Sequence, residues 1–491
     1  MEFALRVGNC GMNQNTLQQK LEALASFPAV KGETVAEVGR VLAGLSSWEL
    51  FRINPLRFAA EHKFDASEMI NLFVHGAKVG LFDFAWNMLC PSCGSIVDSH
   101  VSLNEVEENL FHCVACHIDV PSNLDDHVEV AFTINPSVKR LDIAPFKDTE
   151  SYWRYFRSAN HQRSPALTDY IGEVSRAAAL LAPDEAQSLS LAAEPGKLYR
   201  VISVDNHAAA FIRFSDEQSA TVQTLDLAVL PNSVTPKETT IDAGGVTINV
   251  RNLCKTHTGV FLVLTDLQRL HAILNEHPSK FLPFLTGKML LNNQSFRELF
   301  RIQHLIPDLK LRLRSLTLLF TDLKGSTALY DQTGDVFAYN LVQEHYQILT
   351  ASVRENAGAV IKTMGDALMA TFSSPLDGVN AALEMMEKMK PFNTRLLRDN
   401  HTLGLKIGLH EGSALAVNAE DRLDYFGQTV NVAARVQALA QAHEICVTEP
   451  VFQADGVRRA FADSGYHAEH RSVSLRGVGQ PAIVYQLKKQ Q

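Results

Sequence analysis

The sequence has no long apolar run. None of its hydrophobic stretches approaches the roughly 18 residues that a membrane-spanning helix needs, and residues 1–7 lack the hydrophobic region of a signal peptide. Positive charge is also scarce, because 54 aspartates and glutamates outnumber 45 lysines and arginines and leave a net charge of −9. This balance argues against broad binding to nucleic acids or anionic membranes. We therefore expect a cytoplasmic protein with no membrane association and no general affinity for nucleic acid.

The chain is long enough for several domains. Its 491 residues, of which 46% are hydrophobic and 20% are charged, suffice for several separately buried cores. Hydrophobic spacing changes along the sequence from helical to strand-like and back. We therefore predict an α+β multidomain protein.

Cysteine is scarce as well, yet four of the seven cysteines form two Cys-x-x-Cys pairs. Cys90 with Cys93 and Cys113 with Cys116 are separated by residues 94–112, which is the spacing of a zinc ribbon. Two disulfides are the alternative, but the expected cytoplasmic location disfavours them. Four thiolates leave no open coordination position for catalysis, so we expect one structural Zn²⁺ per chain.

The first part of the chain is predicted to be helical around the cysteine pairs. Residues 1–34 show no sustained hydrophobic period and are expected to form a partly ordered lead-in, and residues 35–145 a helical unit with the zinc ribbon. Apolar positions between Thr34 and Phe84 fit three short helices, and residues 127–134 fit a strand. One interpretation of the three helices is a helix-turn-helix unit, and a zinc ribbon just after such a unit is typical of transcription factors. The alternative is a helical cap packed on the ribbon. The absence of a Lys/Arg cluster favours the cap.

The hydrophobic spacing changes twice in the middle of the chain. Helical spacing over residues 146–195 predicts a helical segment, which Pro195 and Gly196 end. Short alternating apolar segments over residues 196–266 predict a small antiparallel β sandwich or barrel. This β domain contains no catalytic constellation, so it is either a sensor or partner-binding unit or plain scaffolding. Residues 267–312 return to helical spacing and are predicted to be a helical connector.

Residues 313–491 contain the stretches that point to chemistry. The apolar run Leu316–Phe320 predicts a buried strand, and Asp322 follows it within two residues. Two later apolar runs are joined by a short polar tip that contains Asp366, which predicts a hairpin. If the two strands are neighbours, Asp322 and Asp366 can share metal ions.

Paired carboxylates at strand ends suit divalent metals. Mg²⁺ and Mn²⁺ bind carboxylates and complete their coordination with water and substrate phosphates. Gly325, Ser326 and Thr327 open the next helical segment and would supply backbone N–H groups to those phosphates. Either aspartate alone is more typical of a turn or a helix cap. Lys324–Thr327 is similar to the end of a phosphate-binding P-loop, but the upstream glycine of that motif is absent, so we exclude it.

Four motifs, in order along this region, resemble the catalytic elements of class III nucleotide cyclases. They are Phe320–Thr327, Ile361–Asp366, Gly408–Gly412 and Asp424–Arg435. Four ordered matches by chance are rare, and the resemblance extends from about Ser315 to about Leu487. It implies a ferredoxin-like βαββαβ core with additions. It also implies a homodimer, because the family joins two catalytic domains head to tail.

The resemblance implies a role for each matching residue. Asp322 and Asp366 would bind two Mg²⁺ or Mn²⁺ ions per active site, where the ribose 3′-oxygen attacks the α-phosphorus. Asn431 would position the ribose, and Arg435 would stabilise charge on the phosphate in the transition state. These two residues lie four positions apart, so on a helix they face the same side. A solvated helix face is the alternative, which their apolar neighbours disfavour.

Base recognition would rest on Lys362 and Asp424. An ammonium donates to N1 of adenine and a carboxylate accepts from its N6 amino group, whereas guanine presents the reversed pattern. In the family this pair is the adenylyl signature, so ATP is the expected substrate and cyclic AMP the product. Arg476 stands where the family usually has a lysine that contacts the terminal phosphates, and an arginine can make the same contact. Ser413 departs from the family, some members of which have an arginine there to hold phosphate.

The sequence therefore predicts a homodimeric adenylyl cyclase of signal transduction, regulated by its N-terminal region. No motif identifies the ligand or protein that this region senses, and movement of the helical connector could reposition the dimer. Two alternatives stay open. One is a catalytically weak nucleotide-binding signalling module, against which the joint presence of both aspartates, Asn431 and Arg435 argues. The other is a nucleic-acid-binding regulator that acts through the zinc ribbon.

Overall fold

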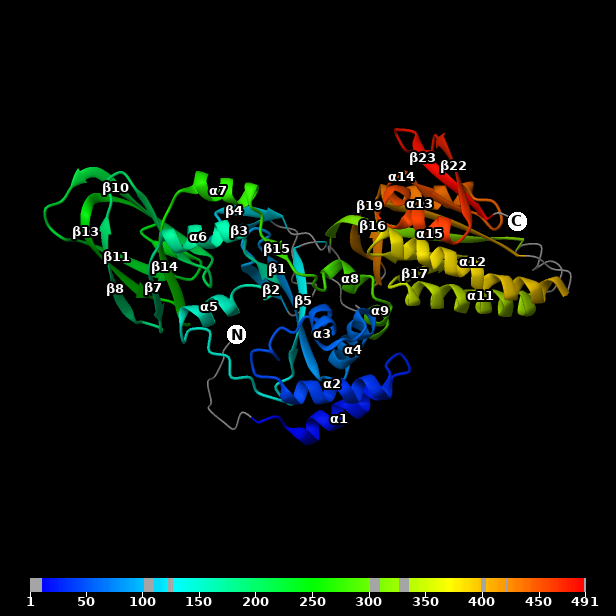
Figure 1. Ribbon diagram of the computed structural model, residues 1–491, viewed down its shortest axis with the longest axis horizontal. Helices are drawn as coiled ribbons and strands as arrows, with labels where there is room; N and C mark the ends of the chain where they lie inside the picture. The colour runs from blue at the N-terminus through cyan, green and yellow to red at the C-terminus, as the bar shows by residue number, and fades with distance from the viewer. Residues whose placement is uncertain are drawn as a thin grey trace.

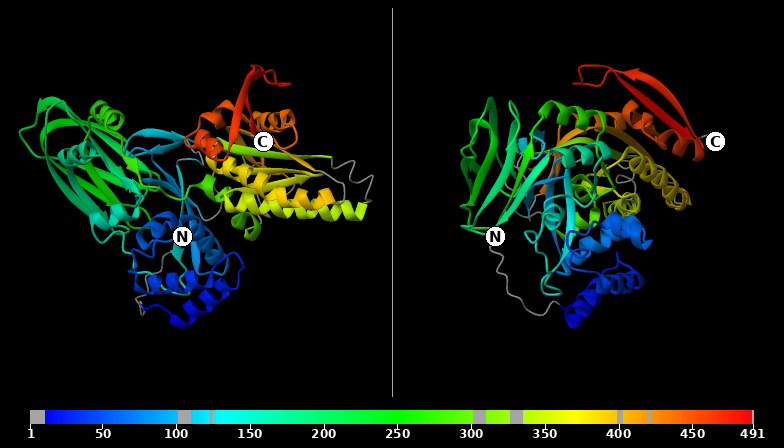
Figure 2. Two further views of the ribbon diagram at one scale, coloured as in Figure 1. Left: turned by 45° about the vertical axis from the view of Figure 1, so that its right-hand side comes forward. Right: turned by 60° about the vertical axis from the view of Figure 1, so that its left-hand side comes forward.

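The computed structural model places the N-terminal helices and their sheet between a β domain and the C-terminal region. The turned views keep this order (Figure 1, Figure 2). The structure describes residues 11–100, 110–121, 125, 127–300, 310–325, 335–398, 403–419 and 422–489. None of the helices in these ranges combines the length and apolar composition needed to span a bilayer.

Four helices open the described chain. They are α1 Gln14–Ala25, α2 Gly32–Gly44, α3 Pro55–His62 and α4 Ala66–Lys78. The last two begin where a side chain accepts backbone N–H groups, because Asn54 caps α3 and Asp65 caps α4. The three helices predicted between Thr34 and Phe84 are confirmed, and α1 forms within the segment 1–34.

A three-stranded antiparallel sheet follows the helices. Its strands are β1 Phe82–Leu89, β2 Ile96–His100 and β5 Val128–Ile134, in the order β2-β1-β5. A hairpin of β3 Leu110–Cys113 and β4 Ile118–Pro121 lies next to β2. Phe73 of α4 stacks on Phe82 of β1 with 4.6 Å between ring centroids, and both side chains are buried. The helical unit therefore packs on the strand that leads to Cys90, which agrees with a helical cap.

The prediction of a helical segment over residues 146–195 is wrong in its second half. The segment contains α5 Thr149–Tyr155, β6 His161–Gln162, α6 Pro165–Val174, β7 Ser175–Leu181 and β8 Ala186–Ala193. The last two are strands because they pair with the distant β14 Thr258–Leu264 and β13 Glu238–Asn252, respectively. These pairings override the helix propensity of an alanine- and leucine-rich segment. Buried Leu189 and Leu191 alternate with exposed neighbours, which is the strand signal that was available in the sequence.

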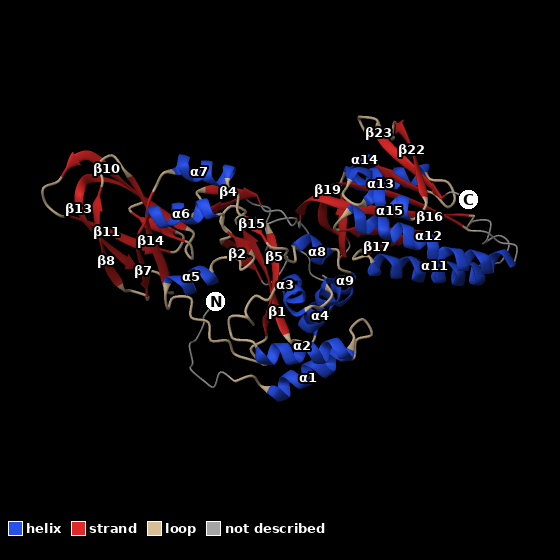
Figure 3. Ribbon diagram, viewed as in Figure 1, coloured by secondary structure: helices blue, strands red, loops and turns tan. Residues whose placement is uncertain are grey.

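The β domain combines antiparallel and parallel pairs, so the prediction of an antiparallel domain is wrong in part. Its further strands are β9 Leu198–Ser203, β10 Ala208–Gln218, β11 Gln223–Leu230 and β12 Ser233–Thr235. The order is β12-β11-β13-β10-β9-β14-β7, with β8 paired to β13. Figure 3 shows the strands of this domain on the left in red. β13 runs parallel to both β10 and β11. The parallel direction arises because the short β12 runs antiparallel to β11 and reverses the chain before β13, which lies between β10 and β11 in the sheet.

A helical connector joins the β domain to the catalytic region. It contains α7 Leu267–Glu276, β15 Lys280–Phe281, α8 Gly287–Leu291 and α9 Gln294–Leu299. The catalytic strand β16 Lys310–Lys324 begins earlier than predicted, inside the expected connector 267–312. Its first residues are a strand because they pair with β19 Gly404–Ala419.

The C-terminal region has the predicted βαββαβ order. After β16 come α11 Asp335–Glu355, β17 Ala359–Met364, β18 Ala367–Phe372, α12 Pro375–Arg398 and then β19. The four strands stand in the order β17-β18-β16-β19 of a ferredoxin-like sheet. The additions are β20 Arg422–Phe426, α13 Gln428–Leu439, β21 Ile445–Thr448, α14 Glu449–Gln453, α15 Val457–Asp463, β22 Tyr466–Val473 and β23 Ala482–Lys489.

The two faces of the catalytic sheet are covered by different parts of the chain. Successive side chains of a strand point to opposite faces. Leu319 and Leu368 therefore pack into a core with α11 and α12, whereas Leu318 and Met369 join the core of the N-terminal helices and sheet. The N-terminal region thus shares a hydrophobic core with the catalytic sheet, and α8 and α9 lie between them (Figure 1).

Candidate active site and metal centre

Asp322 and Asp366 lie at the same end of neighbouring strands. β16 and β18 pair in antiparallel register through Phe320 and Met369. Continued by two residues, this register places Asp322 opposite Ala367. Ala367 is the first residue of β18 and directly follows Asp366 in the sequence. Gly365 forms the hairpin tip with a φ of +67°, a conformation that glycine adopts without strain. The structure therefore brings the two predicted metal ligands to adjoining positions.

Asp322 has a basic partner. Nζ of Lys406 donates to Oδ2 of Asp322 at 3.1 Å, and the two side chains are 18% and 37% exposed. The two residues face each other in the pairing of β16 with β19. In the structure the ammonium of Lys406 therefore balances the charge of this carboxylate. Sequence reasoning missed Lys406, because it belongs to no motif and its position depends on the strand register.

The predicted phosphate-binding turn is described only at its start. Gly325 follows the pairing residues of β16 with a φ of +100°, which favours glycine. Its backbone is exposed to solvent at the same end of the strand as Asp322. Ser326 and Thr327 lie outside the described residues, so their contacts with phosphate stay a prediction.

Lys362 and Asp424, which are 62 residues apart in the sequence, form a direct contact. Nζ of Lys362 donates to Oδ2 of Asp424 at 2.6 Å. Lys362 lies on β17 at the edge of the sheet, and Asp424 lies on β20, which pairs with β19. The strands are not neighbours, so the pair forms only because the β19–β20 hairpin folds toward β17. The side chains are 42% and 20% exposed, which leaves the pair accessible to a ligand.

Asn431 and Arg435 lie on α13, with Asn431 exposed and Arg435 half-buried. The opposite face of the helix packs in a small core with β21 and β23. A Cβ built on Gly477 would lie 3.5 Å from the Arg435 guanidinium. The loop that carries Arg476 therefore passes beside Arg435.

The third motif lets α13 approach the sheet. A Cβ built on Gly408 would lie 2.2 Å from the backbone N of Gln437, so only glycine fits between β19 and α13. Burial lowers the pKa of His410 to about 4, and its Nδ1 lies 2.8 Å from Oγ1 of Thr448. The imidazole is therefore neutral at physiological pH. Gly408 thus lets the helix that carries Asn431 and Arg435 pack directly on β19.

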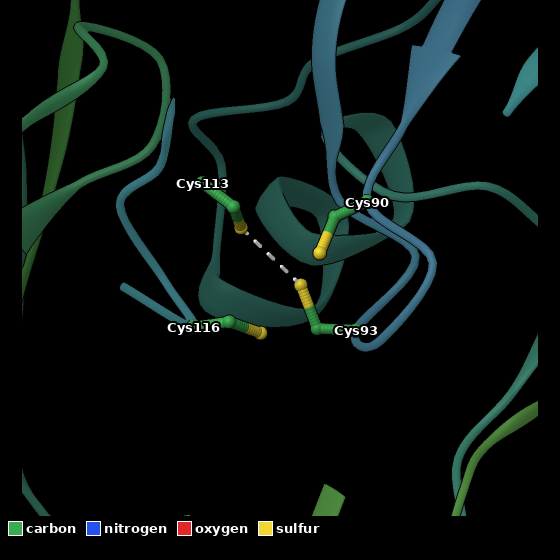
Figure 4. Close-up of side chains that lie close together, drawn as sticks. All are labelled: Cys90, Cys93, Cys113 and Cys116. Atoms are coloured by element: carbon green, nitrogen blue, oxygen red, sulfur yellow. Dashed lines mark hydrogen bonds between the residues drawn. The ribbon is translucent and has the colours of Figure 1, made fainter. Parts of the chain in front are cut away.

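The four predicted zinc ligands converge from two turns (Figure 4). Cys90 and Cys93 lie between β1 and β2, and Cys113 and Cys116 lie at the turn between β3 and β4. All four sulfurs lie within 4.8 Å of one another, and those of Cys93 and Cys113 are 3.7 Å apart. Sulfurs bound tetrahedrally to zinc at about 2.3 Å stand about 3.8 Å from one another. The cluster therefore has the dimensions of a site for one tetrahedral metal ion.

The second cysteine turn is buried against the β domain. Arg200 of β9 is 3% exposed and donates to the carbonyl oxygens of Val114 at 3.2 Å and Ala115 at 3.1 Å. Val114 itself packs with Ile202 and Phe261. This turn is thus part of a domain contact and does not face solvent. Sequence reasoning missed Arg200, whose contact depends on the docking of the β domain.

Two family models match the chain. One, the family of unknown function DUF5939, matches residues 14–298, which is more than half of the chain. The chain belongs to this family. The other model, the adenylate and guanylate cyclase catalytic domain, matches residues 310–489. This DUF5939 protein therefore carries a class III cyclase catalytic domain at its C-terminal end, as the four motifs predict. Domains of this class bind nucleotides and use divalent metal ions.

Curated relatives match about a third of this DUF5939 protein. The adenylate cyclase of Anabaena cylindrica is 26% identical over 191 residues, which cover 36% of this chain and 37% of that protein. The uncharacterized protein Rv2212 of Mycobacterium tuberculosis is 30% identical over 168 residues, which cover 34% of this chain and 40% of that protein. The chain thus spans less than half the length of either relative. The crystal structure of the adenylyl cyclase CyaB from P. aeruginosa covers 37% of this chain and 97% of that chain, with 20% identity and a TM-score of 0.33.

Proposed function

We propose that this DUF5939 protein is an adenylyl cyclase that converts ATP to 3′,5′-cyclic AMP and pyrophosphate. The observation that carries the proposal is the 2.6 Å contact between Lys362 and Asp424 within a cyclase catalytic domain. A donor beside an acceptor complements N1 and the N6 amino group of adenine, whereas guanine presents a donor at N1 and an acceptor at O6. Binding of adenine would exchange the ion pair for two hydrogen bonds to the base.

Other elements of the domain would hold the rest of ATP. Asp322 and Asp366 would bind two Mg²⁺ or Mn²⁺ ions, which supply polarisation of the ribose 3′-hydroxyl and neutralisation of phosphate charge. Asn431 would hold the ribose for in-line attack on the α-phosphorus. Arg435 would donate to the α-phosphate oxygens, where negative charge must be stabilised in the transition state. Arg476 would bind the terminal phosphates from the neighbouring loop.

We further propose that two chains build each active site. One chain would supply Asp322 and Asp366, and its partner would supply the base-binding pair together with Asn431 and Arg435. Lys362 and Asp366 belong to one hairpin, so each hairpin would serve two different sites. The N-terminal region would regulate this dimer, since it shares a core with the catalytic sheet.

One experiment tests the proposed reaction directly. The purified full-length protein is incubated with Mn²⁺ and each of the four nucleoside triphosphates in turn, and the products are identified by mass spectrometry. We expect cyclic AMP and pyrophosphate from ATP as the dominant products. Formation of cyclic GMP alone would overturn the proposed preference for adenine. The absence of any cyclic nucleotide would overturn the proposal that the protein is a nucleotide cyclase.

Reversing the base-binding pair is expected to change the substrate. Lys362→Glu combined with Asp424→Cys should lower the ATP:GTP ratio of kcat/KM by about tenfold or more, because the donor and acceptor no longer match adenine. Steady-state kinetics with both nucleotides measures this ratio. Lys390→Glu is the matched control, because Lys390 pairs with Glu387 on the exposed face of α12. A ratio that stays at the wild-type value would show that Lys362 and Asp424 do not read the base.

We propose that the cysteine cluster holds one structural Zn²⁺. Four buried or half-buried thiols at tetrahedral spacing are the preferred ligand set of that ion. The carbonyl oxygens of the second turn are already held by Arg200, so the turn is preorganised on the β domain. Zinc would therefore stabilise the N-terminal region together with its contact to the β domain.

Removing one thiol is expected to release the zinc. Freshly purified wild-type protein should contain about one zinc per chain, and Cys90→Ser or Cys113→Ser should lose most of it and unfold at a lower temperature. Elemental analysis by mass spectrometry gives the zinc content. Cys254→Ser is the matched control, because this thiol donates to Asn206 at 3.3 Å inside the β domain, away from the cluster. Wild-type protein without zinc would contradict the assignment.

A further inference from the structure

Helix α9 lies between the N-terminal sheet and the two strands that carry the base-binding pair. Figure 1 places α8 and α9 between α4 and the catalytic domain. Three side chains of this segment contact the backbone or side chains of β17, β18 and β20. They are Asn292, Gln294 and Arg297.

Arg297 holds the strand of Asp424. Its Nη2 donates to the carbonyl oxygen of Leu423 at 2.6 Å, and its Nη1 lies 3.5 Å from the carbonyl oxygen of Leu291. Leu423 is the residue directly before Asp424. Hydrogen bonds from a charged donor are stronger than neutral ones, so a half-buried guanidinium is a firm anchor for this part of β20.

Gln294 holds the strand of Lys362. Its Oε1 accepts from the backbone N of Val360 at 2.8 Å, on the outermost strand of the catalytic sheet. Val360 lies two residues before Lys362. The amide is itself fixed, because its Nε2 donates to Glu298 at 2.8 Å, and Glu298 forms an ion pair with Arg354 of α11 at 2.7 Å.

Asn292 contacts the residue that follows Asp424. It is fully buried, and its Oδ1 accepts from the hydroxyl of Thr371 at 2.6 Å and lies 3.5 Å from the hydroxyl of Tyr425. Tyr425 directly follows Asp424. The connector therefore contacts the residue before and the residue after this carboxylate, which restricts the position of the side chain.

The opposite side of α9 packs on the N-terminal sheet. Phe296 is 4% exposed, and its ring centroid lies 6.1 Å from that of Phe84 and 6.2 Å from that of Trp86, both on β1. β1 ends at Leu89, directly before Cys90, the first residue of the cysteine cluster. A shift of β1 would thus be passed to α9 through packed aromatic rings.

We propose that Arg297 and Gln294 are positioning residues for base recognition, through which the N-terminal region sets the nucleotide selectivity of the catalytic domain. They hold β20 and β17 so that Asp424 and Lys362 meet at the spacing that adenine requires. This inference rests on the proposed adenylyl cyclase function. It adds that the selectivity depends on residues outside the catalytic motifs, on a helix that the DUF5939 region positions.

Removing either contact is expected to change selectivity more than turnover. Arg297→Met keeps the length of the side chain but cannot donate, so we expect the KM for ATP to rise about tenfold and the ATP:GTP ratio of kcat/KM to fall by a similar factor. Gln294→Leu should act in the same direction by freeing β17. Arg297→Lys should restore part of the preference, because an ammonium still donates to one carbonyl. Affinities for 3′-deoxy-ATP and 3′-deoxy-GTP, which cannot cyclise, report base preference without turnover.

The controls separate positioning from stability. Arg269→Met removes another arginine, which pairs with Glu173 on α6 far from the catalytic sheet, and should leave both nucleotide ratios unchanged. Loss of packing alone would lower kcat and the unfolding temperature at a constant ATP:GTP ratio. If Arg297→Met does not fold, the ATP:GTP ratio of Gln294→Leu decides between positioning and stability, because this variant removes only one hydrogen-bond acceptor at the edge of the sheet.

Two outcomes would overturn different claims. Wild-type selectivity in folded Arg297→Met and Gln294→Leu, beside a wild-type enzyme that prefers adenine, would overturn the inference and leave the proposed function intact. A wild-type protein that binds the adenine and guanine analogues equally would overturn base reading by Lys362 and Asp424 itself.

Discussion

Asp322→Ala and Asp366→Ala should each lower turnover by about a thousandfold or more, since metal ions supply several kcal/mol of transition-state stabilisation. The folded state should be nearly unaffected by Asp366→Ala. Asp322→Ala also removes the partner of Lys406, whose ammonium lies 3.1 Å from the carboxylate. Asp322→Asn keeps an oxygen that can accept from Lys406, so this variant should be as inactive as the alanine variant and closer to wild type in unfolding temperature.

Turnover with Mn²⁺ and ATP, together with thermal unfolding, measures both effects. Asp463→Ala is a suitable control, because Asp463 pairs with Arg459 on the exposed face of α15, and its removal should leave turnover within about twofold of wild type. Substantial activity in both Asp322→Asn and Asp366→Ala would refute the assignment of the metal ligands.

Mixing two inactive variants should restore activity. Asp322→Ala and Arg435→Ala lie on opposite halves of the proposed shared site, so each is expected to be nearly inactive alone. A mixed dimer has one site with both lesions and one site with neither. After random exchange, half of the dimers are mixed and half of their sites are intact, so activity should recover to about a quarter of wild type.

A second mixture provides the matched control. Asp322→Ala and Asp366→Ala fall on the same half of the site, so every site in their mixed dimer carries one lesion and no activity should return. Exchange is verified by native mass spectrometry of chains with different isotopic labels. Failure of the first mixture despite demonstrated exchange would mean that one chain builds the whole site.

Short stretches of sequence were sufficient to predict the catalytic fold, through the resemblance of four motifs, and the cysteine cluster. The apolar run before Asp322 and the hairpin around Asp366 are each encoded within a few residues, and the structure adds α11 and α12 around them. The cysteine pairs likewise carry their own geometry, because each tight turn sets the distance between its two thiols. These features depend little on the rest of the chain.

Strands whose partners lie far away in sequence were harder to predict. β7 and β8 are rich in alanine and leucine, and they become strands only through pairing with β14 and β13. The parallel direction of β13 beside β10 and β11 also follows from the path of the chain and not from the composition of the strands.

The sequence by itself determined the candidate site residues, namely the paired aspartates, the proposed base-binding pair, the α13 residues and the four cysteines. Only the tertiary structure decided which further side chains touch them. Lys406 meets Asp322 through the register of β16 with β19, Arg297 meets β20 across a domain contact, and Arg200 meets the cysteine turn in the same way. Such contacts join segments that are distant in sequence. They depend on strand register and domain docking, which the packing of the whole chain sets and no local pattern encodes.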